Sequence, residues 1–186
     1  FNKQSIPQKA RTVKKMRVFR KNSRLFYIEN PDKVRQEKFF IEQMRLAEKY
    51  SLPVSVHARR ALFRVMAIIK QFPQVKGVIH AFPGSKEEAR QVVDLGWKIG
   101  VGGAVTYPGS KRLRDVVRFV PIEALVLETD CPDMAPADRI DRRSYPADIV
   151  HYATIVAQLR GETTDAVTEA IFANALAAFP RLANLV

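Results

Sequence analysis

Cysteine is nearly absent from this sequence, and apolar runs of membrane-spanning length are missing from it. Cys131, the only cysteine, cannot form a disulfide within the chain, which agrees with a reducing, cytoplasmic location. No membrane association is expected, and no apolar segment follows the basic start as a secretory signal would require. The 186 residues, 47% of them hydrophobic, are sufficient for a single globular domain with a buried core.

Acidic residues are missing from the first 24 positions. The cations of this lead are Lys3, Lys9, Arg11, Lys14, Lys15, Arg17, Arg20, Lys21 and Arg24, so most of the net charge of +12 lies there. A basic lead is either a phosphate-binding arm, a transit peptide or a stretch outside the fold. Because it shows no clear period and the chain opens on Phe1, we expect residues 1–29 to lie outside the native fold and residues 30–186 to form the domain.

From residue 30 onward, the sequence alternates between the apolar periods of helices and strands. Strands are expected at 52–57, 76–82, 97–103 and 124–130. Helices are expected at 30–50, 59–72, 85–96, 110–120, 145–160 and 163–179. This alternation predicts an α/β domain with a parallel sheet and helices outside it.

The first of these helices, 30–50, carries an N-terminal signal and a broad apolar side. Asn30 is the candidate cap, and Pro31 suits the first helical position. The apolar side comprises Val34, Phe39, Phe40, Met44, Leu46 and Ala47. Such a side is typical of a helix that packs on a core.

Polar side chains end three of the expected strands. His57 closes "VSVH", His80 closes "GVIH" and Asp130 closes "LVLETD". In a parallel barrel, the carboxyl ends of all strands open on one face, where their side chains meet. A single histidine at a strand end is more commonly a core residue with a satisfied hydrogen bond. Two of three histidines and an aspartate at equivalent ends favour a divalent metal of the zinc, manganese or iron type, and carboxylate ligands also admit magnesium.

Four consecutive segments resemble, in order and spacing, the second half of TatD-type metal-dependent deoxyribonucleases of the amidohydrolase-like barrel superfamily. They are "LPVSVHARRA", "GVIHAFPGS", "GWKIGVGGAVTYP" and "VLETDCPDMAP". The resemblance implies a TIM-type (β/α) barrel and hydrolysis of DNA phosphodiester bonds by a metal-activated water. It implies that His57 and His80 bind one of two divalent ions (Mg, Mn or Zn). It further implies that the catalytic Asp130 binds the other ion and helps to orient or deprotonate the water.

Two family motifs have no counterpart here: the initial His-x-His strand and the later Gly-Glu strand whose glutamate bridges the metals. Four strands are expected where a full barrel needs eight. The sequence therefore resembles the C-terminal half of the barrel, and we expect the nuclease activity of this chain alone to be impaired. The alternative is a non-catalytic remnant that binds metal or nucleic acid. Open sheet edges also predict self-association.

Glu128 shares strand parity with Asp130 and is expected to point to the same side. It either positions the metal ligands, by hydrogen bonding or by pairing with a cation such as Arg59, or forms a plain buried ion pair. Arg59 either contacts substrate phosphate or is an exposed arginine without a role. The glycine-rich segment 100–111 is either an anion-binding loop or a turn that uses glycine for positive φ. His151 is expected to be structural, and Asn174 to be a packing or capping group.

Overall fold

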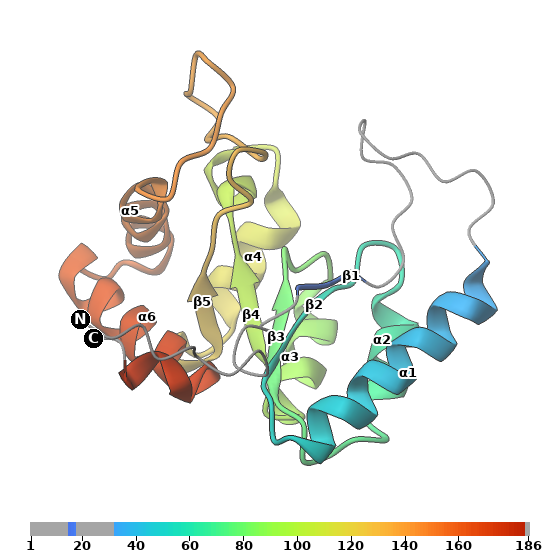
Figure 1. Ribbon diagram of the computed structural model, residues 1–186. Helices are drawn as coiled ribbons and strands as arrows, with labels where there is room; N and C mark the ends of the chain where they lie inside the picture. The colour runs from blue at the N-terminus through green and yellow to red at the C-terminus, as the bar shows by residue number, and fades with distance from the viewer. Residues whose placement is uncertain (1–14, 18–31, 185–186) are drawn as a thin grey trace, which may run out of the picture.

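One parallel sheet organises the molecule (Figure 1). The computed structural model describes residues 15–17 and 32–184. Within them the strands lie side by side in chain order, as β1 (Lys15–Arg17), β2 (Val54–His57), β3 (Gly77–His80), β4 (Lys98–Val101) and β5 (Leu125–Leu127). Every neighbouring pair is parallel, so the carboxyl ends of all five strands lie at the same end of the sheet.

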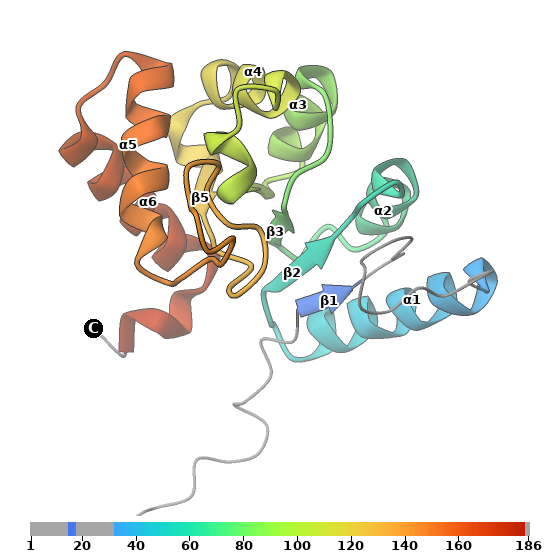
Figure 2. The same cartoon turned by 90° about the horizontal axis from the view of Figure 1, so that it is seen from above.

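Helices connect the strands and cover the outer side of the sheet. They are α1 (Lys33–Lys49), α2 (Leu62–Ile69), α3 (Lys86–Asp94), α4 (Lys111–Phe119), α5 (Asp148–Arg160) and α6 (Thr164–Ala178), with short 3-10 helices at Gly103–Thr106, Ile122–Ala124 and Pro180–Asn184. Seen from above, α1 to α4 follow one another around the outside of the strands (Figure 2). The predicted α/β alternation is confirmed. None of the helices in the described residues is long and apolar enough to cross a membrane.

Helix α1 begins later than the sequence predicts. Its N-cap is Asp32, whose Oδ1 accepts a hydrogen bond of 2.9 Å from the N–H of Arg35. Asp32 is suited to this role because its carboxylate can satisfy a free N–H of the first helical turn. The predicted cap Asn30 and the predicted first helical residue Pro31 lie outside the described residues.

The apolar side of α1 is narrower than predicted. Phe40, Met44 and Ala47 are buried against the rest of the fold. The exposed fraction is 80% for Val34, 57% for Phe39 and 53% for Leu46. A helix that lies on one sheet buries only one stripe of its surface, so these three apolar residues are left facing outward.

A strand inside the basic lead was not predicted. β1 pairs with β2 in parallel register, from Lys15 beside Ser55 to Arg17 beside His57. It forms the edge of the sheet next to the first histidine strand. Lys15–Arg17 thus belong to the sheet, which differs from the expectation that residues 1–29 lie outside the native fold; the rest of that lead lies outside the described residues.

The strand residues alternate between two environments. Side chains on the outer side, such as Val56, Ile79 and Ile99, join the helices in the main core. The opposite, inner side holds a small apolar cluster of Val78, Val126 and Ala178, with Phe179 packed against it. His57 and His80 share this inner side by strand parity. The inner side is therefore apolar only over a small area, and its carboxyl end is polar.

Asn174 fixes the last helix to the last strand, in line with the expected capping role. Its buried Nδ2 donates hydrogen bonds to the carbonyl oxygens of Ile122 at 2.7 Å and Leu125 at 2.9 Å. Helix α6 is thereby attached to the start of β5, the strand that leads to Glu128 and Asp130.

Candidate metal centre

The two predicted histidines meet at the carboxyl ends of adjacent strands. His57 and His80 occupy matching register positions of β2 and β3. Their ring centroids lie 5.5 Å apart, and the rings are tilted by 42°. The structure thus brings together two imidazoles that are 23 positions apart in the sequence.

Asp130 and Glu128 each lie beside one of the two ring nitrogens of His80. Nε2 of His80 lies 2.9 Å from Oδ1 of Asp130, and Nδ1 lies 2.5 Å from Oε2 of Glu128. The His80 side chain is only 5% exposed. Nε2 faces Asp130 without the geometry of a regular hydrogen bond.

The carboxylates also control the charge of this imidazole. Burial lowers the pKa of His80, but the nearby carboxylates of Asp130 and Glu128 outweigh that effect and raise the pKa from 6.5 to about 9. In the absence of metal, this raised pKa favours the charged ring at neutral pH, with a proton on both nitrogens. A metal at Nε2 competes with that proton, because a ligating imidazole must be neutral.

Glu128 is anchored at both of its carboxylate oxygens. Oε2 accepts from Nδ1 of His80, and Oε1 accepts a 2.6 Å hydrogen bond from the N–H of Ala81. A carboxylate on the nitrogen opposite to the ligating one is a common way to orient a metal-binding histidine. The contact with His80 is what the structure adds to the predicted role of Glu128.

Arg59 is exposed and lies in the turn that follows β2.

His57, His80 and Asp130 supply imidazole nitrogens and a carboxylate, a donor set that suits zinc or manganese. Across residues 15–17 and 32–184, however, no group of three or more His, Cys, Asp or Glu side chains is arranged as a metal-holding set. The donor chemistry fits a metal, and the ligand roles of these three residues stay predictions.

The glycine-rich segment serves a purpose that its sequence did not predict. Positive φ occurs at Gly96 and Gly161 among the described glycines, so the positive-φ interpretation of segment 100–111 is wrong. Instead, a Cβ at Gly100 would lie 2.9 Å from Oε2 of Glu128. The signal was present in the sequence as a glycine at an inward strand position, between the strands of His80 and Glu128. The anion-loop interpretation stays a prediction.

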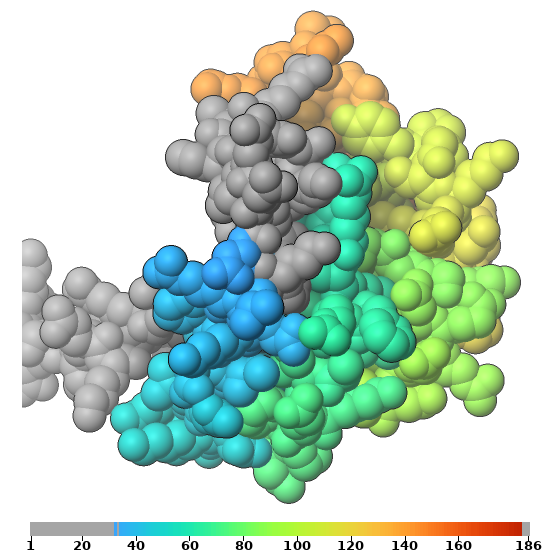
Figure 3. All heavy atoms as spheres, turned by 90° about the vertical axis from the view of Figure 1, so that its right-hand side faces the viewer, coloured from blue at the N-terminus to red at the C-terminus, as the bar shows by residue number. Residues whose placement is uncertain are grey.

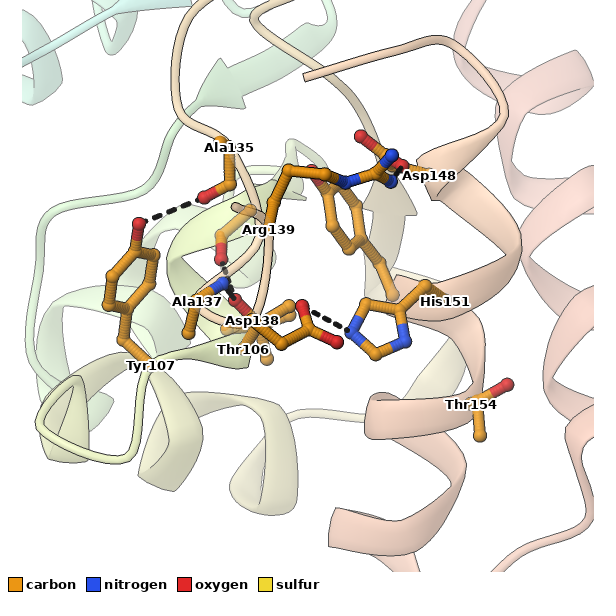
Figure 4. Close-up of polar contacts among 12 residues, drawn as sticks. Thr106, Tyr107, Ala135, Ala137, Asp138, Arg139, Asp148, His151 and Thr154 are labelled. Atoms are coloured by element: carbon orange, nitrogen blue, oxygen red, sulfur yellow. Dashed lines mark hydrogen bonds and ion pairs between the residues drawn. The ribbon is translucent and has the colours of Figure 1, made fainter. Parts of the chain in front are cut away.

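A separate open hollow of about 600 Å³ lies beside the loop that follows β5. Its lining comprises Asp138, Arg139, Ile140, Asp141 and His151, and none of the predicted metal ligands. Figure 4 shows Asp138 facing His151, at 3.7 Å between Oδ1 and Nε2, and Arg139 reaching Asp148. Tyr107 and Thr106 hold the same loop through Ala135 and Ala137. His151 is thus a partly exposed surface residue.

Sequence comparisons identify a protein family and individual relatives of this chain. A family model described as TatD related DNase matches residues 25–180. An uncharacterized metal-dependent hydrolase of Escherichia coli, YjjV, is 36% identical over 152 residues, which cover 81% of this chain and 59% of YjjV. The 3'-5' ssDNA/RNA exonuclease TatD of Citrobacter koseri is 35% identical over 151 residues, which cover 74% of this chain and 58% of that protein.

The fold has the same relatives. The crystal structure of Escherichia coli YjjV, a TatD homologue, superposes with a TM-score of 0.77 at 35% identity, covering 84% of this chain and 60% of that one. A TatD-family hydrolase of Entamoeba histolytica shares the fold with a TM-score of 0.73 at 24% identity, covering 82% and 59%. The chain therefore spans about three-fifths of the length of these relatives.

Proposed function

The chain belongs to the family of TatD-related DNases, whose relatives include metal-dependent hydrolases, and we propose that it contributes the histidine–aspartate side of a site that hydrolyses DNA phosphodiester bonds. One observation carries this proposal: His80 meets Asp130 at 2.9 Å and His57 at 5.5 Å between ring centroids. Three strand ends converge there in a partly buried setting, where polar groups act with little competition from water.

Each residue has a defined part in the proposed reaction. His57 and His80 would hold one divalent ion, and Asp130 would contribute a carboxylate to a second. A divalent ion of the Mg, Mn or Zn type supplies Lewis acidity. Asp130 orients the attacking water and accepts its proton. Glu128 holds the His80 ring in place from its Nδ1 side.

The charges around the strand ends support a polyanionic substrate. Exposed cations lie in the loops and first helical turns that follow the strands, namely Arg59, Arg60, Lys86, Lys111, Arg112, Arg142 and Arg143. Lysine and arginine side chains in such positions neutralise phosphates and attract nucleic acid. DNA is therefore the proposed substrate, and Arg59 is a proposed phosphate contact.

We further propose that this chain alone has little nuclease activity, since His57, His80 and Asp130 form an incomplete shell for two metals. The alternative is a non-catalytic protein that binds metal or nucleic acid. The edge strand β1 and the exposed apolar residues of α1 support self-association with a second copy. A cytoplasmic location is proposed on the basis of the single cysteine in the sequence.

A hydrolysis assay with a completed barrel tests the proposal. The part of Escherichia coli YjjV that this chain does not match, which the sequence resemblance implies to be its amino-terminal part, is fused to the chain. Nucleotide release from single-stranded DNA is then measured with added manganese or magnesium. We expect turnover by the fusion protein, little by the chain alone and none by the Asp130→Asn fusion, because an amide cannot accept the proton. Turnover by the Asp130→Asn fusion contradicts the role of Asp130, and strong turnover by the isolated monomeric chain contradicts the proposed impairment.

A further inference from the structure

Glu128 reaches its partner across an intervening strand. It directly follows β5, and its N–H continues the ladder to the carbonyl oxygen of Val101 on β4. His80 ends β3, and β4 lies between β3 and β5 in the sheet. Adjacent strands are roughly 4.8 Å apart, so the two backbones are separated by roughly 9.6 Å. The Glu128 side chain therefore has to pass over β4 before it can meet the imidazole.

The crossing point is Gly100. This residue pairs in register with Val126, two positions before Glu128, and so faces the inner side. A Cβ built on Gly100 would lie 2.9 Å from Oε2, 3.0 Å from Cδ and 3.0 Å from Oε1 of Glu128. These distances are shorter than ordinary van der Waals contact. A side chain at position 100 would therefore force the Glu128 carboxylate to shift from its present place.

The crossing carboxylate fixes the end of β3 at two points. It accepts from Nδ1 of His80 at 2.5 Å and from the N–H of Ala81 at 2.6 Å. Ala81 has a φ of +47°, a left-handed conformation that is unfavourable for alanine. With Nδ1 engaged by Glu128, the other ring nitrogen is the one that faces Asp130. The orientation of the His80 ring thus depends on the Glu128 carboxylate.

We propose that Gly100 and Glu128 are positioning residues: the missing side chain at Gly100 admits the Glu128 carboxylate, which aims Nε2 of His80 into the metal centre. This inference rests on the proposed function only in the identity of what Nε2 binds. Gly100 acts through Glu128, so its effect requires Glu128. Both residues are assigned a role that acts through His80 and not through direct contact with the substrate.

The test compares the full chain with Gly100→Ala, Glu128→Ala and the double variant, using two measurements. The first is the NMR resonance of the His80 Nδ1 proton in metal-free protein, identified by its loss in His80→Gln. The second is zinc affinity by competition with a chelator. We expect each single variant to lose the hydrogen-bonded resonance and to bind zinc roughly 10–100-fold more weakly. We expect the double variant to resemble Glu128→Ala, because the two changes remove the same contact.

Gly102→Ala is the matched control. It adds the same methyl group two positions along, where the nearest atom is the Glu128 carbonyl oxygen at 3.4 Å, an ordinary contact. It should keep both the resonance and the zinc affinity. The proposal is overturned if Gly100→Ala leaves both readouts unchanged. It is also overturned if Gly100→Ala weakens zinc binding as much in the Glu128→Ala background as it does in the wild-type chain. If Gly100→Ala fails to fold, a folded Glu128→Ala that keeps the resonance also overturns it. A wild-type chain that binds no zinc contradicts the proposed function, while the resonance still decides the positioning role.

Discussion

His57 and His80 end neighbouring parallel strands at matching register positions, with their ring centroids 5.5 Å apart. In this register the two side chains lie on the same side of the sheet, because in-register residues of adjacent parallel strands project to the same side. Asp130 adds a carboxylate within 2.9 Å of the second ring. Three residues of different chain segments thereby share one small volume, and their chemistry can be tested separately from the rest of the fold.

Changing both histidines to alanine should remove divalent metal binding. The wild-type chain is expected to bind one zinc or manganese ion weakly, since two imidazoles and a carboxylate leave the shell incomplete. Isothermal titration calorimetry compares wild type with the His57→Ala/His80→Ala variant. His151→Ala removes the third histidine, which lies outside this group, and should bind as wild type does. Equal affinity in wild type and the double variant contradicts the assignment.

Stability of the metal-free protein should fall as the pH rises from 6.5 to about 9, because folding raises the pKa of His80 across that interval. The folded protein keeps a proton there that the unfolded chain has lost, so the contribution of the charged ring is complete below pH 6.5 and is lost as the pH passes about 9. Urea unfolding at several pH values measures the slope. His80→Gln should flatten it, and a wild-type stability that rises over this interval would refute the prediction.

Gly77→Ala should destabilise the sheet by about 1–3 kcal/mol. A Cβ at this position would lie 1.9 Å from the carbonyl oxygen of Val54, so the backbones of β2 and β3 would have to separate. Gly109→Ala is the control, since nothing lies within 4 Å of its Cβ position. Denaturant midpoints of the two variants provide the comparison. Equal midpoints would show that β2 and β3 are not packed as described.

Leu46→Glu on α1 should reduce self-association. Phe39, Leu46 and Tyr50 are spaced seven and four residues apart, so they share one helix face, and each is at least 48% exposed. Figure 3 shows α1 at the surface of the molecule beside α2. Sedimentation velocity should show dimers or larger species for wild type and a shift toward monomer for the variant. Glu42→Gln, an exposed change on the same helix, should sediment as wild type does; a monomeric wild-type chain would contradict the prediction.

Much of this architecture follows from local sequence patterns. The strand carrying His57 and the strand carrying His80 are bounded by turn residues. Their alternation with helical segments predicts a parallel α/β fold. The cap of α1 was harder to place, because Asn30 and Asp32 are both good capping residues and only the geometry of the first turn selects between them. β1 has three residues and no recognisable period, so its pairing with β2 depends on tertiary contact.

The sequence likewise predicts one part of the candidate site and not another. Strand-end positions place His57, His80 and Asp130 together without knowledge of distances. The link from Glu128 to His80 could not be read in this way, because it joins strands that are not neighbours and depends on the empty space above Gly100. A glycine in a strand has several physical explanations, and only the sheet order distinguishes them.

Anomalous X-ray scattering from crystals soaked in manganese or zinc tests the central claim most directly, since it locates the metal without relying on activity. The account predicts an anomalous peak within ligand distance of Nε2 of His80 and beside His57 and Asp130, and no such peak in the His57→Ala/His80→Ala variant. A fully occupied metal elsewhere on the molecule, with none at these strand ends, would contradict it.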